Sequence, residues 1–148
     1  MIKKNDVQLN NLSELVEFTL NDTENKRGFV DLGELPNEQI ENLKQQTGKD
    51  LSGFKRMVDS YSIKHIFKNH GNPKTEATRG QIAVTKNDIE NLPTLLAETD
   101  KSKLDGLNRL GREVIKHEKK ETHKHIIIEE IRPKNKVISL DSMWILKK

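Results

Sequence analysis

The sequence predicts an α+β fold, with helices in the earlier part of the chain and a small antiparallel sheet at its end. Two observations favour this class. Apolar residues recur at helical spacing on both sides of Gly48, and three apolar runs separated by short polar links lie between residues 113 and 146. A chain in which helices are followed by strands, without regular alternation of the two, is typical of α+β domains.

The composition bounds the class of protein. A chain of 148 residues predicts one compact domain, and 32% hydrophobic residues grouped in blocks favour a folded chain despite 33% charged residues. The absence of cysteine excludes disulfides and thiolate metal sites, which favours a reducing compartment. No apolar run approaches the roughly 18 residues of a membrane span or forms a signal peptide, so we expect a cytoplasmic protein without membrane association.

Charge is unevenly distributed along the chain. Residues 1–60 hold 8 Lys and Arg against 11 Asp and Glu, whereas residues 61–148 hold 18 against 12, and all five histidines. The two parts therefore carry net charges of −3 and +6. A basic half indicates a polyanionic partner, and a lysine-rich surface that serves only solubility is the competing interpretation.

The first elements are expected to be helical. Leu12 to Leu20 is an apolar cluster in polar surroundings, and we interpret it as a lead-in that forms a short helix or strand. Leu35-Pro36 is expected to open a helix, because proline suits the first turn and Glu38 favours the positive end, and Gly48 is expected to end it.

A second helical region is expected after Ser52-Gly53. Phe54, Met57, Val58, Tyr61 and His65 recur at helical spacing. The alternative is a separate short helix that is capped by Ser60 or Ser62 and runs to His70. In both cases Gly71, as a left-handed terminator, and Pro73 end the helix.

The middle of the chain carries three local signals. Gln81 to Thr85 predicts a short strand, and Thr85-Lys86-Asn87-Asp88 resembles a capping box that begins the next helix. Pro93 is expected to break or kink that helix. A polar loop containing Gly106 and Gly111 then leads to the last third.

The last third predicts three antiparallel strands: Glu113 to Lys119, Thr122 to Ile131 and Lys136 to Leu146. The links between them are short and polar, as hairpins require. Ile126-Ile127-Ile128 indicates a central strand that is covered on part of both faces. In the third strand, alternation places Ile138, Leu140, Ser142 and Trp144 on one face.

Two histidines and two lysines fall within seven residues: Lys64, His65, Lys68 and His70. Cleaving RNA without a metal requires a base for the ribose 2′-hydroxyl, an acid for the leaving 5′-oxygen, and a cation for the phosphate. Histidine suits both proton transfers because its ordinary pKa is about 6.5. On an ideal helix His65 and His70 are about 140° apart, so we expect them to share a face only if the helix ends between them. Packed structural histidines are the competing interpretation.

Other polar residues are weaker candidates. His117 and Lys119 line an anionic groove or a solvated sheet face, and His123 and His125 have the spacing of metal ligands on a strand. Without a cysteine or a clear carboxylate ligand, we expect neither a metal nor a cofactor. Glu129 and Glu130 are expected on opposite faces, with one of them pairing with Arg132 or another base. The candidates for contacting phosphate are Arg79, Lys116, Lys124 and the hydroxyl of Ser142.

Four segments together resemble a known family. They are Ile63-Lys64-His65 with Asn69-His70-Gly71-Asn72-Pro73, then Arg79-Gly80-Gln81-Ile82-Ala83-Val84-Thr85, then Ile127-Ile128-Glu129-Glu130-Ile131-Arg132, and Leu140-Asp141-Ser142-Met143-Trp144. In this order they are similar to the phage-associated Barnase–EndoU–colicin–RelE-like (BECR-fold) nuclease domains. The resemblance runs from about Phe29 to Leu146, which divides the chain into a variable lead-in (1–28) and a nuclease domain (29–148).

The resemblance implies N-terminal helices packed on a small, mostly four-stranded antiparallel sheet, and a metal-independent ribonuclease. It implies that His65 and His70 are catalytic, that Ser142 contacts the scissile phosphate, and that Arg79 and Thr85 belong to the site. We expect Lys64, Lys68, Lys116, Lys124 and Trp144 to bind the substrate. Trp144 stands where such domains commonly have a tyrosine.

The expected function is therefore an endoribonuclease that forms a 2′,3′-cyclic phosphate and serves as a toxin or effector of a phage or mobile element. Its expected partners are RNA, with tRNA among the candidates, and an immunity or antitoxin protein. A catalytically inactive RNA- or protein-binding module on the same fold, acting as a virion or host-takeover accessory, is the alternative. The RNA target, the order of the two histidines and the oligomeric state stay open.

Overall fold

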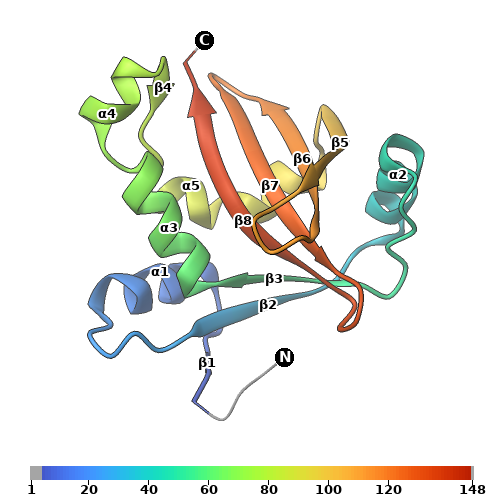
Figure 1. Ribbon diagram of the computed structural model, residues 1–148, viewed down its shortest axis with the longest axis horizontal. Coiled ribbons are helices and arrows are strands. Elements are labelled where there is room, and N and C mark those ends of the chain that lie inside the picture. Colours follow the sequence, from blue (N-terminus) through green and yellow to red (C-terminus); the bar gives the residue numbers. More distant parts are fainter. Residues whose placement is uncertain (1–4, 148) are drawn as a thin grey trace.

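Residues 5–147, which the computed structural model describes, form a mixed eight-stranded sheet and six helices (Figure 1). In chain order the elements are β1 (Val7–Gln8), α1 (Leu12–Asn21), β2 (Gly28–Glu34), α2 (Asn37–Thr47), β3 (Lys55–Asp59), α3 (Ser60–His70), α4 (Pro73–Thr78), β4 (Gln81–Ile82), α5 (Lys86–Glu90), α6 (Leu92–Ala97), β5 (Lys101–Leu107), β6 (Glu113–Lys120), β7 (Lys124–Arg132) and β8 (Val137–Leu146). None of the described helices is long and apolar enough to cross a membrane.

The α+β class is confirmed, but the expectation of a small, four-stranded antiparallel sheet is wrong. The strand order is β1-β2-β3-β8-β7-β6-β5, with β4 paired to β8 beside this path. Strands β6 to β8 are the three expected antiparallel strands, and β5 adds a fourth in place of the expected polar loop containing Gly106. Strand β1 with β2 and β3 with β8 are parallel pairs. The additional strands come from the N-terminal part, whose polar sequence carries weak strand signals.

The expected helix after Gly53 is also wrong in its first part. Residues Lys55–Asp59 form β3, because the short run of Met57 and Val58 fits a buried strand as well as a helical face. The helix begins only at Ser60, after Asp59, whose side chain caps it by accepting from the Ser62 backbone N–H at 2.9 Å. The alternative of a separate short helix ending at His70 is therefore confirmed, with a different cap.

Several local predictions are confirmed. Helix α2 ends at Gly48, which has a positive φ of 78°. Thr85 and Asp88 form the expected capping box at the start of α5, and Pro93 lies in the first turn of α6, where a new helix begins. The three C-terminal strands lie within one or two residues of their expected bounds.

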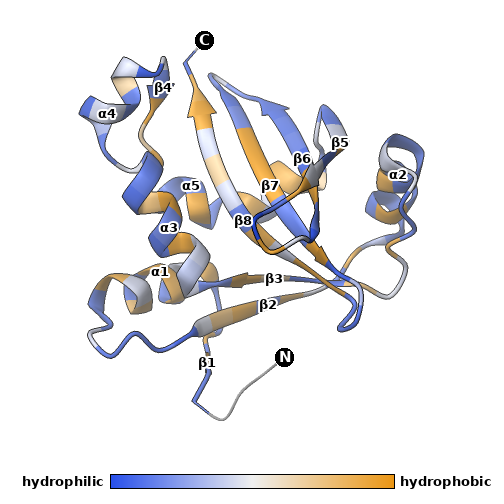
Figure 2. Cartoon of the chain, in the orientation of Figure 1, coloured by the Kyte–Doolittle hydropathy of each residue, from blue (hydrophilic) through white to orange (hydrophobic). Residues whose placement is uncertain are grey.

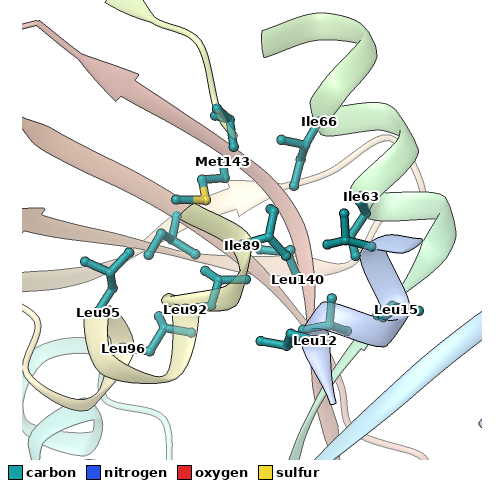
Figure 3. Close-up of a cluster of buried hydrophobic side chains, with 14 of the residues drawn as sticks. Leu12, Leu15, Ile63, Ile66, Ile89, Leu92, Leu95, Leu96, Leu140 and Met143 are labelled. Carbon is teal, nitrogen blue, oxygen red and sulfur yellow. The ribbon is translucent and has the colours of Figure 1, made fainter. Parts of the chain in front are cut away.

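The main core lies on one face of β7 and β8. Figure 3 shows Leu12 and Leu15 of α1 and Ile63 and Ile66 of α3 converging on β8 together with the leucines of α6. In Figure 2 hydrophobic colour follows β7 and parts of β8. Helix α5 lies behind these strands in Figure 1, so the face toward the viewer is left without a covering helix. We call this face of β5 to β8 the open face.

A β-bulge in β8 changes which residues reach the open face. Ser142 pairs with Ile128 and Leu140 pairs with Glu129, so Asp141 is the extra residue between them. Leu140 therefore points into the main core while Ser142 lies on the open face. The expectation that Ile138, Leu140, Ser142 and Trp144 share a face is wrong: Ile138 and Leu140 are in the core, and simple alternation does not reveal a bulge.

Gly71 ends α3 for a different reason than expected. Its φ of −98° and ψ of −4° are right-handed, so it is not a left-handed terminator. A Cβ at this position would lie 2.5 Å from the backbone oxygen of Phe67, which cannot move without disturbing the last turn of α3.

Replacing Gly71 by alanine is expected to lower the free energy of unfolding by about 1–3 kcal/mol, the usual cost of overpacking. For a chain of this size the melting temperature falls by roughly 2–4 °C per kcal/mol. Urea unfolding followed by the fluorescence of Trp144 measures the change. An unchanged urea midpoint contradicts the conclusion that the end of α3 has no room for a Cβ at position 71.

Candidate functional site

The open face has an apolar floor with lysines along one side. Two rows of paired residues cross it, one of them formed by Lys103, Lys116, Ile128 and Ser142 and the other by Lys101, Glu118, Ile126 and Trp144. Ile126 and Ile128 pack with Val114, Trp144 and Leu146 in a cluster separate from the main core. Lysines on β5 and β6 thus lie beside an apolar, aromatic surface, which suits a chain with phosphates and stacking bases.

His70 lies at the end of α3, against the open face. Its ring stacks on Trp144 with the ring centroids 5.8 Å apart and the planes 30° from parallel. Its Nδ1 lies 3.2 Å from Oε2 of Glu76, a side chain that is fully buried. Among the described residues Nε2 has no hydrogen-bond partner, so this nitrogen is available to a ligand.

Glu76 reaches His70 because a new helix begins directly after α3. The Asn72 side chain caps α4 by accepting from the Lys74 backbone N–H at 2.9 Å, and Pro73 occupies the first turn. This places Glu76 one turn further, facing back toward α3. Arg79 donates to the other oxygen of Glu76 at 3.1 Å and to the Asn69 carbonyl at 3.0 Å, which holds α4 against α3.

His65 is exposed on α3 and lines a cavity of about 500 Å³ at the other end of the open face. The Asn69 side-chain amide lies 3.1 Å from its Nδ1. The walls of the cavity come from the start of α3, the β5–β6 loop and the strands β7 and β8: Asp59, Tyr61, Ser62, His65, Asn108, Arg109, Leu110, Glu130, Arg132 and Asp141.

The two histidines therefore border the same sheet face at different places. Helix α3 continues through His70, so it does not end between them and the two side chains leave it about 140° apart. His70 faces Trp144, and His65 faces the cavity that contains Asp141. On β8, Ser142 lies between Asp141 and Trp144, and so between the surroundings of the two rings.

The predicted phosphate contacts separate into two groups. Lys116 is half-buried on the open face, two strands away from Ser142, and Lys124 pairs with Glu118 on the same face at 2.5 Å. Lys64 and Lys68 are exposed four residues apart on one side of α3. Lys64 lines a small depression with residues of the α1–β2 loop, which directs it away from Ser142.

Thr85 and the remaining histidines have structural contacts. The Thr85 hydroxyl donates to Asp88 at 2.9 Å within the capping box, and Asp88 lies 3.8 Å from Nε2 of His125. His123 precedes β7, so the two histidines do not alternate on one strand as expected. The described residues contain no group of three or more His, Asp or Glu side chains that could hold a metal ion.

His117 is buried, so the expectation that it lines a groove or a solvated face is wrong. Its Nε2 lies 2.8 Å from Oε1 of Glu129 and its Nδ1 lies 2.8 Å from the Ser102 hydroxyl. Glu129 also accepts two hydrogen bonds from Arg56 of β3. As predicted, Glu129 and Glu130 point to opposite faces, and Glu130 pairs with Arg132.

Sequence reasoning missed two residues of the site, Glu76 and Asp141. Asn72-Pro73 is a usable signal for Glu76, since it marks a helix start that brings the fourth helical residue back toward His70. Asp141 has no such signal, because only the bulge sets its direction. Burial, followed by the nearby Glu130 carboxylate, raises the pKa of Asp141, against the opposite influence of His65.

The comparisons with known proteins identify a family. No curated protein and no solved structure matches the chain at a significant level. The model of one family, described as phage-Barnase-EndoU-ColicinE5/D-RelE like nuclease, matches residues 35–148. This range is well over half of the chain and contains α3, α4 and the whole open face. The chain therefore belongs to the phage-Barnase-EndoU-ColicinE5/D-RelE like nuclease family.

Proposed function

We propose that this nuclease is a metal-independent endoribonuclease that uses the ribose 2′-hydroxyl as its nucleophile. The observation that carries the proposal is the contact between Nδ1 of His70 and the buried Glu76 on an otherwise open sheet face. The carboxylate accepts a hydrogen bond, so in neutral His70 the proton resides on Nδ1 and Nε2 carries the lone pair. Nε2 is then in the form that accepts a proton.

His70 is the general base in this proposal. Its Nε2 takes the proton of the 2′-hydroxyl, whose oxygen attacks the phosphorus and displaces the 5′-oxygen of the next nucleotide. Glu76 positions the ring and stabilises the imidazolium that forms, and Arg79 keeps Glu76 in place. Stacking on Trp144 fixes the plane of the ring.

His65 is the general acid, and the remaining residues hold the phosphate. His65 borders the same face from the other side of Ser142, where it can protonate the leaving 5′-oxygen. The Ser142 hydroxyl and the Lys116 ammonium lie on the same row of the open face and offer donors to the phosphate oxygens. The products are a 2′,3′-cyclic phosphate and a free 5′-hydroxyl, and this transesterification consumes neither water nor another reagent.

The role we propose for this activity is that of a toxin or effector of a phage or mobile element. The family description, which names colicin- and RelE-like nucleases, supports it. Such an enzyme needs an immunity or antitoxin protein in the cell that produces it.

The pure protein is expected to cleave total RNA or tRNA in the presence of EDTA and to leave 2′,3′-cyclic phosphate ends. Gel analysis before and after treatment with a phosphatase that opens cyclic phosphates identifies these ends. Cleavage that stops with EDTA and returns with added metal contradicts the mechanism. RNA that is bound in a salt-dependent way but recovered intact supports the alternative of an inactive binding module.

A further inference from the structure

The cavity beside His65 contains a carboxylate whose oxygens make no hydrogen bond or ion pair with a described residue. Asp141 and Arg109 both line the cavity, and neither side chain has a hydrogen bond or ion pair within 4 Å to another described residue. Asp141 is half-buried and Arg109 is exposed. A carboxylate held half-buried without a direct partner loses hydration, and the nearby charges of His65, Arg132 and Arg109 offset that loss only in part, which suggests that its partner is a ligand.

The other charges of the cavity are already paired. Glu130 accepts from Asn108 at 2.6 Å and from Arg112 at 3.0 Å, and it also pairs with Arg132. These contacts tie β7 to the β5–β6 loop and form a fixed wall. Asp141 therefore remains as the carboxylate in the cavity whose oxygens have room for new donors.

The bulge in β8 explains why Asp141 points into the cavity. A regular strand would pair this residue with β7 and turn it away from its two neighbours. Leu140 pairs with Glu129 and Ser142 pairs with Ile128, so Asp141 has no partner residue on β7. Its side chain lines the cavity instead. Ser142, the proposed phosphate contact, is the next residue, so the cavity lies one residue along the strand from the proposed scissile phosphate.

We propose that this cavity binds the base of the nucleotide at the cleavage point and that Asp141 selects guanine. A carboxylate accepts two parallel hydrogen bonds best. Guanine offers two adjacent donors, N1–H and N2–H, on one edge. Adenine and cytosine place a ring acceptor beside their amino group, and uracil places its N3–H between two carbonyls, so each of them directs an acceptor at the carboxylate.

Arg109 complements this choice. The O6 and N7 atoms of guanine are acceptors, and arginine is the side chain that most often contacts both of them. The cavity volume of about 500 Å³ accommodates a purine, and the Tyr61 ring on its wall offers a stacking surface. Burial and the Glu130 carboxylate raise the pKa of Asp141, which means that the fold stabilises its ionised form poorly. Two N–H donors from a base would supply the missing hydrogen bonds to this carboxylate.

The inference rests on the proposed function and is tested with RNA oligonucleotides that differ only in the nucleotide before the cleaved bond. The parent is expected to cleave after guanosine at least about 10-fold faster than after adenosine, cytidine or uridine, the lower range for one bidentate base contact. In Asp141→Asn this preference falls at least about 10-fold, while cleavage after the other bases stays within about threefold. Asp31→Asn, a half-buried aspartate outside the cavity, keeps the parent's preference.

A binding measurement separates this inference from the proposed function. In calorimetric titrations 3′-GMP is expected to bind the parent at least about 10-fold more tightly than 3′-AMP, and Asp141→Asn to bind both alike. Preferential binding of 3′-GMP without any RNA cleavage supports the base site while the proposed ribonuclease fails. Equal cleavage after all four bases, equal binding of both nucleotides, or a uniform loss of cleavage in Asp141→Asn overturns the inference.

Discussion

Replacing His70 by alanine is expected to lower the rate of RNA cleavage by about 10²–10⁴-fold, the usual contribution of one positioned acid or base. The physical reason is the loss of Nε2, the ring nitrogen that Glu76 leaves with a lone pair and that no described residue engages. Because the step lost is proton transfer, kcat falls while KM changes little. Single-turnover cleavage of one oligonucleotide, with parent and variant at equal concentration, measures the effect.

The matched control is His123→Ala, which removes an imidazole outside the site, in the turn before β7. It is expected to cleave like the parent. Circular dichroism and a cooperative urea transition followed by Trp144 fluorescence check that His70→Ala is folded. The starting fluorescence of Trp144 is expected to differ from the parent's, because the stacked imidazole ring is lost. Imidazole in solution is expected to restore part of the activity of His70→Ala, which a purely structural role does not allow.

A second measurement compares the parent and His70→Ala in cells. If the proposed toxin role holds, induced expression of the parent stops growth, and His70→Ala does not. If His70→Ala cleaves RNA as fast as the parent in vitro, the assignment of His70 as the general base is contradicted. His65→Ala tests the general acid in the same assays, with a loss of similar size.

The parts of the fold that follow from the sequence are those with strong local signals. Gly48 after a periodic run, the Thr85–Asp88 capping box and Pro93 are short-range features whose physics does not depend on the rest of the chain. The isoleucines of β7 indicate a central strand because side chains on both of its faces are buried: Ile127 lies in the main core, and Ile126 and Ile128 lie in the Trp144 cluster on the open face.

What the sequence does not reveal depends on distant contacts. The run around Met57 and Val58 has no period that separates strand from helix, and β3 exists because it pairs with β2 and β8. The bulge at Asp141 shows no signal in the chain, yet it decides which side chains of β8 face the site. His117 is buried because its partner Glu129 lies on the next strand.

The second large effect is expected at Glu129, which joins three strands from within the fold. Both of its oxygens accept from Arg56 of β3, at 2.8 and 3.0 Å, and Oε1 also lies 2.8 Å from Nε2 of His117 on β6. Arg56 in turn donates to Gln39 of α2 at 2.8 Å. This network links β3, β6, β7 and α2; Arg56, His117 and Glu129 are buried, and Gln39 is half-buried.

Replacing Glu129 by glutamine is expected to lower the free energy of unfolding at pH 7 by about 3–5 kcal/mol, the cost of breaking a buried ion pair from one side. Glutamine keeps the shape but turns an amide N–H₂ toward the guanidinium of Arg56, which stays buried without its counter-charge. Urea unfolding measures the loss. The control is Glu24→Gln, an exposed residue paired with Lys26, which is expected to change stability by less than about 0.5 kcal/mol.

The pH dependence of stability gives this prediction a signature that a simple packing defect lacks. Burial raises the pKa of Glu129, but Arg56 and His117 outweigh it and lower the pKa from 4.5 to about 2. The unfolded chain therefore binds a proton at a higher pH than the folded chain does. The contribution of Glu129 is fully present above pH 4.5 and is lost as the pH falls toward 2.

A shift of this size corresponds to about 3 kcal/mol of stability that the parent loses between these two pH values and that Glu129→Gln, with no proton to bind, does not lose. Unfolding free energies at several pH values between 2 and 7 are thus expected to converge for the two proteins as the pH falls. Parallel curves, with the same gap at every pH, contradict the ionised Arg56–Glu129–His117 network. They indicate instead that the substitution acts only through packing, since packing does not titrate.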